Sequence, residues 1–136
     1  MDYTIDHAVK RRDDRGFLVD FLKGDEVDDG SSSLGQIYFV TFEKSGKTRG
    51  NHYHKTKREW FVVLQGKLRL VLEDTKTKEH KEILLSGDND EYERIYVGKN
   101  IAHAFTSISP SAMMINYADK PYHFDDTDTF SYIIGA

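Results

Sequence analysis

The chain has 136 residues, the size of one ordinary domain, so we expect a single domain over residues 1–136. It has no cysteine, which excludes disulfides and thiolate sites, and its formal net charge of -4 argues against nucleic-acid binding. No apolar run approaches the roughly 18 residues of a membrane span, and the N-terminus is unlike a signal peptide. We therefore expect no membrane partner and a cytoplasmic location.

Strand signals dominate the sequence in chain order. The expected strands are 16–22, 35–42, 60–64, 67–73, 80–85, 94–97, 104–108 and 112–117. Leu68, Leu70 and Leu72 recur at the two-residue period of a half-buried strand, and the turn at Gln65-Gly66-Lys67 predicts that this strand pairs with 60–64 as a hairpin. No segment of about ten residues carries a helical period with caps. About eight short strands without helices predict an all-β sandwich or closed barrel.

A group of histidines and one glutamate forms the most informative pattern. His52 and His54 are two residues apart, so on a strand their side chains point to the same face. Glu59 lies directly before the expected strand 60–64, and His103 lies directly before the expected strand 104–108. These four side chains could hold zinc or another divalent metal, or they could transfer protons near neutral pH.

The remaining histidines are less informative. His7 and His80 have no partners at useful spacing, and we interpret both as ordinary surface residues. The role of His123 stays open because this residue adjoins Tyr122.

The spacing of this group resembles a known motif. Gly46, His52, His54, Glu59 and Gly66 match the first motif of the cupin superfamily position for position. His103 matches the second motif, in which Gly98, Asn100 and Ser107 replace the usual Pro, Gly and Asn. The resemblance implies a cupin (RmlC-like) jelly-roll β-barrel.

Wider segments resemble three groups of cupins that act on nucleotide-activated sugars. Arg49-Gly50-x-His52 and residues 101–105 are similar to the dTDP-4-keto-6-deoxyhexose 3,5-epimerases. The pattern of Tyr38 followed eleven residues later by Arg49-Gly50-x-His52-x-His54-Lys55 is similar to the WxcM-like sugar 3,4-ketoisomerases. The C-terminal cupin domain of capsular-polysaccharide epimerase/reductases is similar over residues 14–16, 35–37, 50–52, 86–88 and 126–130.

These resemblances imply an isomerase of a dTDP- or UDP-linked 4-keto-6-deoxyhexose in cell-surface polysaccharide or deoxysugar biosynthesis. A base removes a proton next to the C4 ketone, an enolate or enediol forms, and the proton returns elsewhere. We expect 3,4-ketoisomerisation, which needs no cofactor. The alternatives are C3 (or C3/C5) epimerisation with a bound metal, a metal-dependent cupin oxygenase, and a non-catalytic sugar-binding cupin.

The resemblances also assign residues. His52 is the expected base, and His54 is expected either to relay a proton or to stabilise the oxyanion. Tyr38 and Tyr122 match tyrosines near the active sites of the relatives, and we expect both to be catalytic. The expected substrate-binding residues are Arg49, Lys55, Asn51 and His103, with Arg49 suited to grip a diphosphate.

Other basic and aromatic residues near the group are expected to be structural. Lys57 and Arg58 are interpreted as a solvated basic face and Trp60 as a core residue. The resemblance implies a homodimer. A separate hypothesis is that residues 3–9 form an exchanged edge strand, and any reductase or transferase partner is expected on a separate chain.

Overall fold

The computed structural model describes residues 1–27, 34–121, 125 and 127–135. Within these ranges the chain is almost entirely β, with one short helix, α1 (Gly24–Val27). The strands are β1 (Tyr3–Val9), β2 (Arg11–Asp13), β3 (Gly16–Leu18), β4 (Gln36–Phe42), β5 (Thr48–Tyr53), β6 (Glu59–Gln65), β7 (Lys67–Asp74), β8 (His80–Ser86), β9 (Glu91–Val97), β10 (Ile101–Ser107), β11 (Ala112–Ala118) and β12 (Phe130–Ser131).

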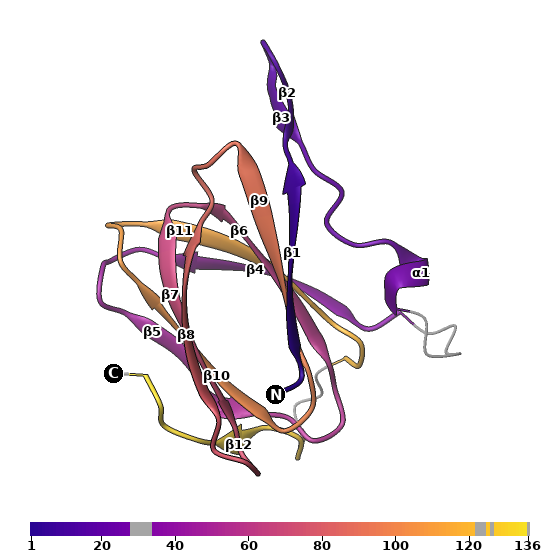
Figure 1. The fold of residues 1–136 in the computed structure, drawn as a ribbon, viewed down its shortest axis with the longest axis vertical. Coiled ribbons are helices and arrows are strands. Elements are labelled where there is room, and N and C mark those ends of the chain that lie inside the picture. Colours follow the sequence, from indigo (N-terminus) through magenta and orange to yellow (C-terminus); the bar gives the residue numbers. More distant parts are fainter. Residues whose placement is uncertain (28–33, 122–124, 126, 136) are drawn as a thin grey trace.

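Two five-stranded antiparallel sheets form the body of the molecule (Figure 1). The first sheet has the order β1-β9-β6-β11-β4 and the second has the order β12-β5-β10-β7-β8. From β4 to β12 the chain changes sheet at every connection except the one between β7 and β8. This arrangement is a jelly-roll sandwich, which confirms the predicted all-β cupin fold. In the described residues no hydrogen-bonded strand pair joins the two sheets, so they are packed layers rather than a closed barrel.

The predicted hairpin between 60–64 and 67–73 is wrong. β6 pairs with β9 and β11 in the first sheet, whereas β7 pairs with β8 and β10 in the second. Gly66 makes the sharp passage between them, because it has φ +82 and a Cβ there would lie 2.3 Å from the carbonyl oxygen of Ser111. The two-residue period identifies the buried face of a strand but not the strand with which it pairs.

Apolar side chains from both sheets fill the space between them. Leu68, Leu70 and Leu72 from β7 are fully buried, as their period predicts, and they meet Phe61 and Phe105 from β6 and β10. β10 is buried along its whole length. Among the described residues no helix is long and apolar enough to cross a membrane.

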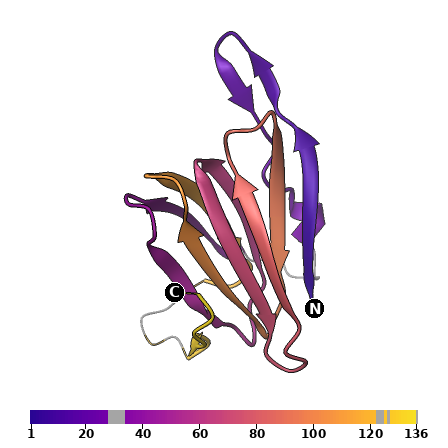
Figure 2. The ribbon, with the colours of Figure 1, turned by 60° about the vertical axis from the view of Figure 1, so that its left-hand side comes forward.

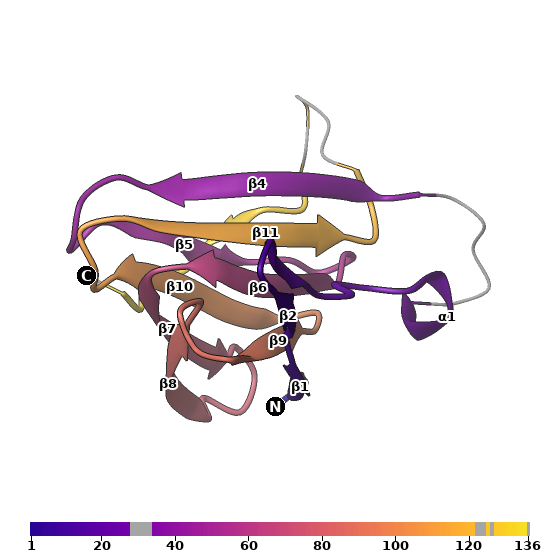
Figure 3. The same ribbon diagram turned by 90° about the horizontal axis from the view of Figure 1, so that it is seen from above.

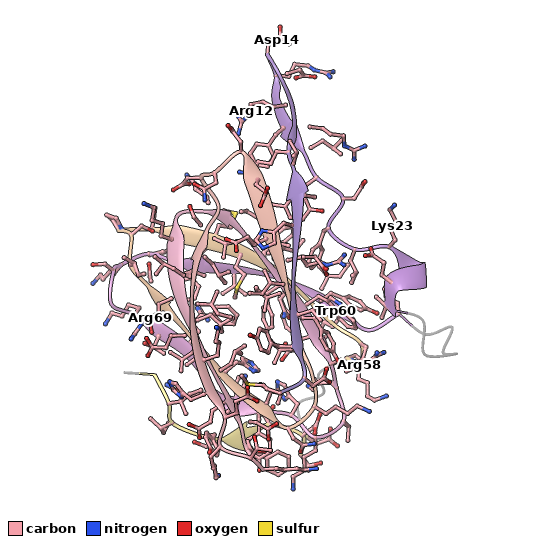
Figure 4. The ribbon with its side chains drawn as sticks, in the orientation of Figure 1. Arg12, Asp14, Lys23, Arg58, Trp60 and Arg69 are labelled. Carbon is pink, nitrogen blue, oxygen red and sulfur yellow. The ribbon has the colours of Figure 1, made fainter. Side chains whose placement is uncertain are left out.

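The N-terminal part adds to the first sheet and then leaves it. β1 pairs with β9, so residues 3–9 form an edge strand of the first sheet. Exchange of this strand between two copies stays a prediction. β2 and β3 form a hairpin that projects beyond the sheets, with Asp14 at its tip (Figures 2 and 4). The predicted strand 16–22 ends at Leu18, because the carbonyl oxygens of Asp20 and Phe21 accept hydrogen bonds from side chains of β9 rather than from a strand.

Candidate active site

The histidines come together where β5 and β10 pair. His52 on β5 lies opposite His103 on β10, and a β-bulge follows His103. Gly50 has φ +103, and a Cβ there would lie 2.6 Å from the carbonyl oxygen of His103. The glycine of the Arg49-Gly50-x-His52 motif is therefore needed for the close approach that brings the two strands, and with them the two imidazoles, together.

The three imidazoles form a compact cluster. Ring centroids lie 4.9 Å apart for His52 and His54, 4.8 Å for His52 and His103, and 5.7 Å for His54 and His103. One ring nitrogen from each histidine lies within 4.8 Å of the other two. The cluster is thus small enough for one ion or one reacting group to contact all three rings.

Glu59 reaches this cluster from the opposite sheet. Its Oε1 atom lies 3.0 Å from Nε2 of His54 and 3.6 Å from Nε2 of His103, and its Oε2 atom accepts a hydrogen bond from Asn116 at 3.1 Å. Oε1 is buried and its two ion-pair contacts are not aligned as hydrogen bonds. A buried carboxylate oxygen without a hydrogen bond is costly in the absence of another partner, so this atom has unused capacity to bind a cation.

Burial and mutual contacts separate the proton affinities of the cluster. Burial and the neighbouring His103 and His54 lower the pKa of His52 to about 4. Burial alone would lower the pKa of His54, but the Glu59 carboxylate outweighs burial and raises it. Burial lowers the pKa of His103, with His54 adding to the effect. Burial alone would raise the pKa of Glu59, but His54 and His103 reverse this and bring it to about 2. At neutral pH the cluster therefore holds an ionised Glu59 beside neutral His52 and His103.

A pocket of about 360 Å³ opens onto the cluster between the two sheets. Its apolar wall includes Val40, Phe61, Phe105, Met114 and Ala118. Its polar groups come from Tyr38, Arg49, His52, His54, Lys57, Glu59, His103, Asn116 and Thr129. The pocket thus combines the histidine–glutamate cluster with the cationic side chains of Arg49 and Lys57 inside a largely apolar wall, which is typical of a small-molecule site.

The structure brings most of the residues expected from the sequence into this pocket. His52, His54, Glu59, His103, Tyr38 and Arg49 all line it. Tyr38 lies on β4 in the first sheet, across the interior from His52 rather than on a neighbouring strand, and its hydroxyl donates a hydrogen bond to Gln36 at 3.1 Å. Tyr122 lies outside the described residues, as does His123.

Two residues expected to bind substrate do not line the pocket. The Lys55 amine lies 4.3 Å from the centre of the Phe130 ring and is exposed. The Asn51 side chain accepts hydrogen bonds from the backbone amides of Ile134 and Gly135, at 3.0 and 2.8 Å, and donates one to the carbonyl oxygen of Gly135 at 3.0 Å. The structure thus gives Asn51 contacts with the C-terminal segment.

The interpretation of Lys57 and Arg58 as a solvated face is wrong. Lys57 is only 5% exposed and lines the pocket. Arg58 forms an ion pair with Asp119 at 2.8 Å and packs against Trp60, with the guanidinium 5.3 Å from the ring (Figure 4). Trp60 itself is buried, as predicted. The missed signal was the two-residue step from Lys57 to Glu59, which places both side chains on one face of an extended chain.

Asn116 and Thr129 were also missed. Asn116 faces Glu59 from the paired strand β11, where Asn116 lies opposite Phe61. Thr129 comes from the C-terminal segment. Neither residue belongs to a local pattern, so no signal in the sequence placed them at the site.

Comparison with known proteins assigns most of the chain to one protein family. The family described as "Polysaccharide biosynthesis C-terminal domain" matches residues 11–130. The chain belongs to this family. It is 29% identical over 124 residues to a UDP-2-acetamido-2,6-beta-L-arabino-hexul-4-ose reductase of Pseudomonas aeruginosa, a match that covers 90% of this chain but only 31% of that protein. The chain therefore spans about a third of that relative's length.

Two further proteins are similar over most of the chain. A TDP-4-oxo-6-deoxy-alpha-D-glucose-3,4-oxoisomerase of Aneurinibacillus thermoaerophilus is 28% identical over 128 residues, which is 94% of this chain and 85% of that protein. The crystal structure of the epimerase RmlC from Legionella pneumophila, in complex with dTDP-4-keto-L-rhamnose, superposes with a TM-score of 0.77 at 24% identity, over 95% of this chain and 71% of that one. This likeness supports the RmlC-like fold.

Proposed function

We propose that this protein is an isomerase of a nucleotide-linked 4-keto-6-deoxyhexose, and that its reaction is 3,4-ketoisomerisation. The observation that carries the proposal is the convergence of His52, His54, Glu59 and His103 in a pocket that also contains Arg49 and Tyr38. The similarity to a 3,4-oxoisomerase along 85% of that protein's length supports the choice of reaction.

The reaction needs a base and an acid close together. His52 is neutral at pH 7 because its pKa is lowered to about 4, so its free ring nitrogen accepts the C3 proton of the sugar. A bound diphosphate adds negative charge nearby, which raises the pKa of His52 and strengthens it as a base. His54, whose pKa the Glu59 carboxylate raises, is the matching proton donor. Two histidines with their pKa values pushed apart, and rings 4.9 Å from each other, form an acid–base pair.

The proton and electron shifts balance within the sugar. Loss of the C3 proton to His52 sends the C–H electron pair into a C3–C4 double bond and leaves negative charge on the C4 oxygen, which takes a proton to give an enediol. The C3 hydroxyl then loses its proton, C4 gains one, and the ketone is at C3. Arg49 and Lys57 provide the positive charge that holds the diphosphate and the oxyanion in the pocket.

We also propose that the cluster can hold a divalent cation. The donors are three imidazoles and the buried Glu59 oxygen that lacks a hydrogen bond, a set that suits zinc or another divalent transition metal. His52, His54, Glu59 and His103 would be the ligands, and the ion would supply Lewis-acid stabilisation of the ketone oxygen. Ketoisomerisation by the histidines themselves does not require it, so metal content is a separate question.

A second candidate is C3 epimerisation of the same substrate class. It is favoured by the complete three-histidine and one-glutamate set, and by the superposition on an epimerase with a TM-score of 0.77. In this reaction the proton returns to the opposite face of C3 and the ketone stays at C4.

One product assay separates the candidates. A dTDP- or UDP-4-keto-6-deoxyhexose is incubated with the protein in D2O, with and without chelator, and deuterium and stereochemistry are located by NMR. We expect deuterium at C4 and a C3 ketone, whereas deuterium at an inverted C3 identifies an epimerase. An unchanged sugar that still binds indicates a sugar-binding cupin, and oxygen consumption with stoichiometric iron indicates an oxygenase. A His52→Asn variant serves as the control, and near-normal turnover by it would exclude His52 as the base.

We propose that the protein is a homodimer in solution. Ile37 and Phe39 on the outer face of edge strand β4 are 54% and 75% exposed, and β4 lies away from β8 at the outside of the molecule (Figure 3). A second copy would cover this apolar face. Light scattering after size-exclusion should give the mass of two chains for the wild type and of one chain for Phe39→Asp, and a monomeric wild type would contradict the proposal. The cytoplasmic location stays a prediction.

A further inference from the structure

The C-terminal segment returns to the site and forms its outer edge. β12 pairs with β5, with Phe130 opposite Tyr53 and Ser131 opposite His52, and the segment appears in yellow in Figure 1. The Phe130 and Tyr53 rings stack with centroids 5.2 Å apart. The segment 128–135, which we call the C-terminal strap, therefore lies directly against the strand that carries the candidate base.

Asp128 connects this strap to the residues that follow His52. Its carboxylate accepts hydrogen bonds from the backbone amides of Lys55 and Thr56, at 2.8 and 3.0 Å, and from the Thr56 hydroxyl at 2.7 Å. These contacts hold the turn immediately after His54. The backbone of the turn is thus tied to a residue more than seventy positions away in the sequence.

The same residue also holds the His54 ring. The carbonyl oxygen of Asp128 lies 2.8 Å from Nδ1 of His54. A carbonyl oxygen only accepts hydrogen bonds, so Nδ1 must carry a proton in this contact. Nε2 of the same ring faces the cluster, where it lies 3.0 Å from Oε1 of Glu59. One residue therefore sets both the backbone position of His54 and the ring nitrogen that it presents.

We propose that Asp128 is a positioning residue, which holds His54 with Nδ1 protonated and Nε2 directed into the pocket. The catalytic consequence rests on the proposed isomerase function, whereas the ring orientation does not. A partner at the outer nitrogen of a functional histidine fixes its tautomer and its orientation, and loss of such a partner typically costs about 10–100-fold in activity or metal affinity.

The test compares two substitutions at Asp128. Asp128→Ala removes all three carboxylate contacts and frees the turn and the strap carbonyl. Asp128→Asn keeps an oxygen that accepts from the two amides, while the Thr56 hydroxyl can accept from the new amide group. Tyr132→Phe is the matched control for a loosened strap, because it removes the Tyr132 hydroxyl contacts with Glu73 and Lys78 without touching His54.

The readouts are ring 15N NMR of chelator-treated protein, recorded above the pKa of His54 so that the ring is neutral and its two tautomers differ, and steady-state kinetics. We expect Asp128→Ala to lose the Nδ1-protonated signature of His54 and to lower kcat by roughly tenfold or more, with KM changed little. Asp128→Asn should restore both, and Tyr132→Phe should leave both as in the wild type. An unchanged His54 signature in Asp128→Ala would overturn the proposal, as would an equal loss in Asp128→Asn or Tyr132→Phe. If the wild type proves not to isomerise the sugar, the NMR comparison still decides the role of Asp128.

Discussion

Substitution of Asn51 by alanine should loosen the C-terminal strap, because the Asn51 side chain ties this segment to β5. The sequence predicts that Asn51 binds substrate, whereas the structure shows its side chain in three hydrogen bonds with Ile134 and Gly135 of the C-terminal strap. At about 1 kcal/mol for each bond, Asn51→Ala should weaken the strap by about 3 kcal/mol. Since 1.4 kcal/mol changes an equilibrium constant by a factor of ten, the equilibrium constant for local opening of the strap should rise about a hundredfold.

The backbone of Asn51 adds a second, separate effect. Its φ is 56, in the left-handed region that Asn tolerates and Ala does not, so Asn51→Ala also strains β5 by about 1 kcal/mol. This strain should lower the free energy of global unfolding in urea, whereas the lost hydrogen bonds should appear in the strap. The two effects can therefore be measured separately.

The assay for the strap is amide hydrogen exchange at Ile134 and Gly135. We expect both amides to lose about two orders of magnitude of protection in Asn51→Ala. Asn51→Asp is the matched control, because its carboxylate still accepts from both amides, although it places an acceptor oxygen in place of the donor that faces the Gly135 carbonyl. Unchanged protection in Asn51→Ala, together with a raised KM for the nucleotide sugar, would refute this reasoning and favour substrate binding.

The other predictions concern the pocket. Gly50→Ala places a Cβ 2.6 Å from the His103 carbonyl oxygen at φ +103, so urea unfolding should show a loss of about 2 kcal/mol or more and kcat should fall. Glu59 has its pKa lowered to about 2, so its ionised form stabilises the fold above the ordinary value of 4.5, and this stabilisation is lost as pH falls toward 2. The stability advantage of wild type over Glu59→Gln should therefore be largest at neutral pH and shrink between pH 5 and 2. Lys57→Met removes a buried cationic side chain from the pocket, so the KM for a nucleotide-diphosphate sugar should rise roughly tenfold. Lys55→Met, which removes an exposed lysine outside the pocket, is the comparison. Zinc at a hundred times its dissociation constant should stabilise the wild type by about 2.7 kcal/mol and leave Glu59→Gln much less affected; equal thermal shifts in both would contradict the ligand set.

Local patterns in the sequence predicted much of the fold. The expected strands 35–42, 67–73, 80–85 and 112–117 agree with β4, β7, β8 and β11 to within one residue at each end. Each carries enough apolar or β-branched residues to bury a face. β5 was not among the expected strands, because it is polar along the pocket and passes through Gly50 and Asn51 with positive φ.

The site was predictable to the extent that its residues are neighbours in the chain. His52 and His54 share a face because of the two-residue step, and the spacing to Glu59 matches a known motif. Lys57 carries the same two-residue relation to Glu59 and could have been found from it. Asn116, Thr129 and Asp128 could not, since their contacts with the site come from strand pairing and from the return of the C-terminal strap.

The sequence by itself determined the all-β class, the buried faces of the main strands and the histidine–glutamate set, because these depend on periodicity and spacing over a few residues. Only the tertiary structure decided which sheet each strand joins, that Lys57 is inside the pocket, and that Asn51 and Asp128 hold the strap. The physical reason is that pairing and burial depend on residues far apart in the chain, where one polar side chain has many possible partners and the packing of the whole domain selects one.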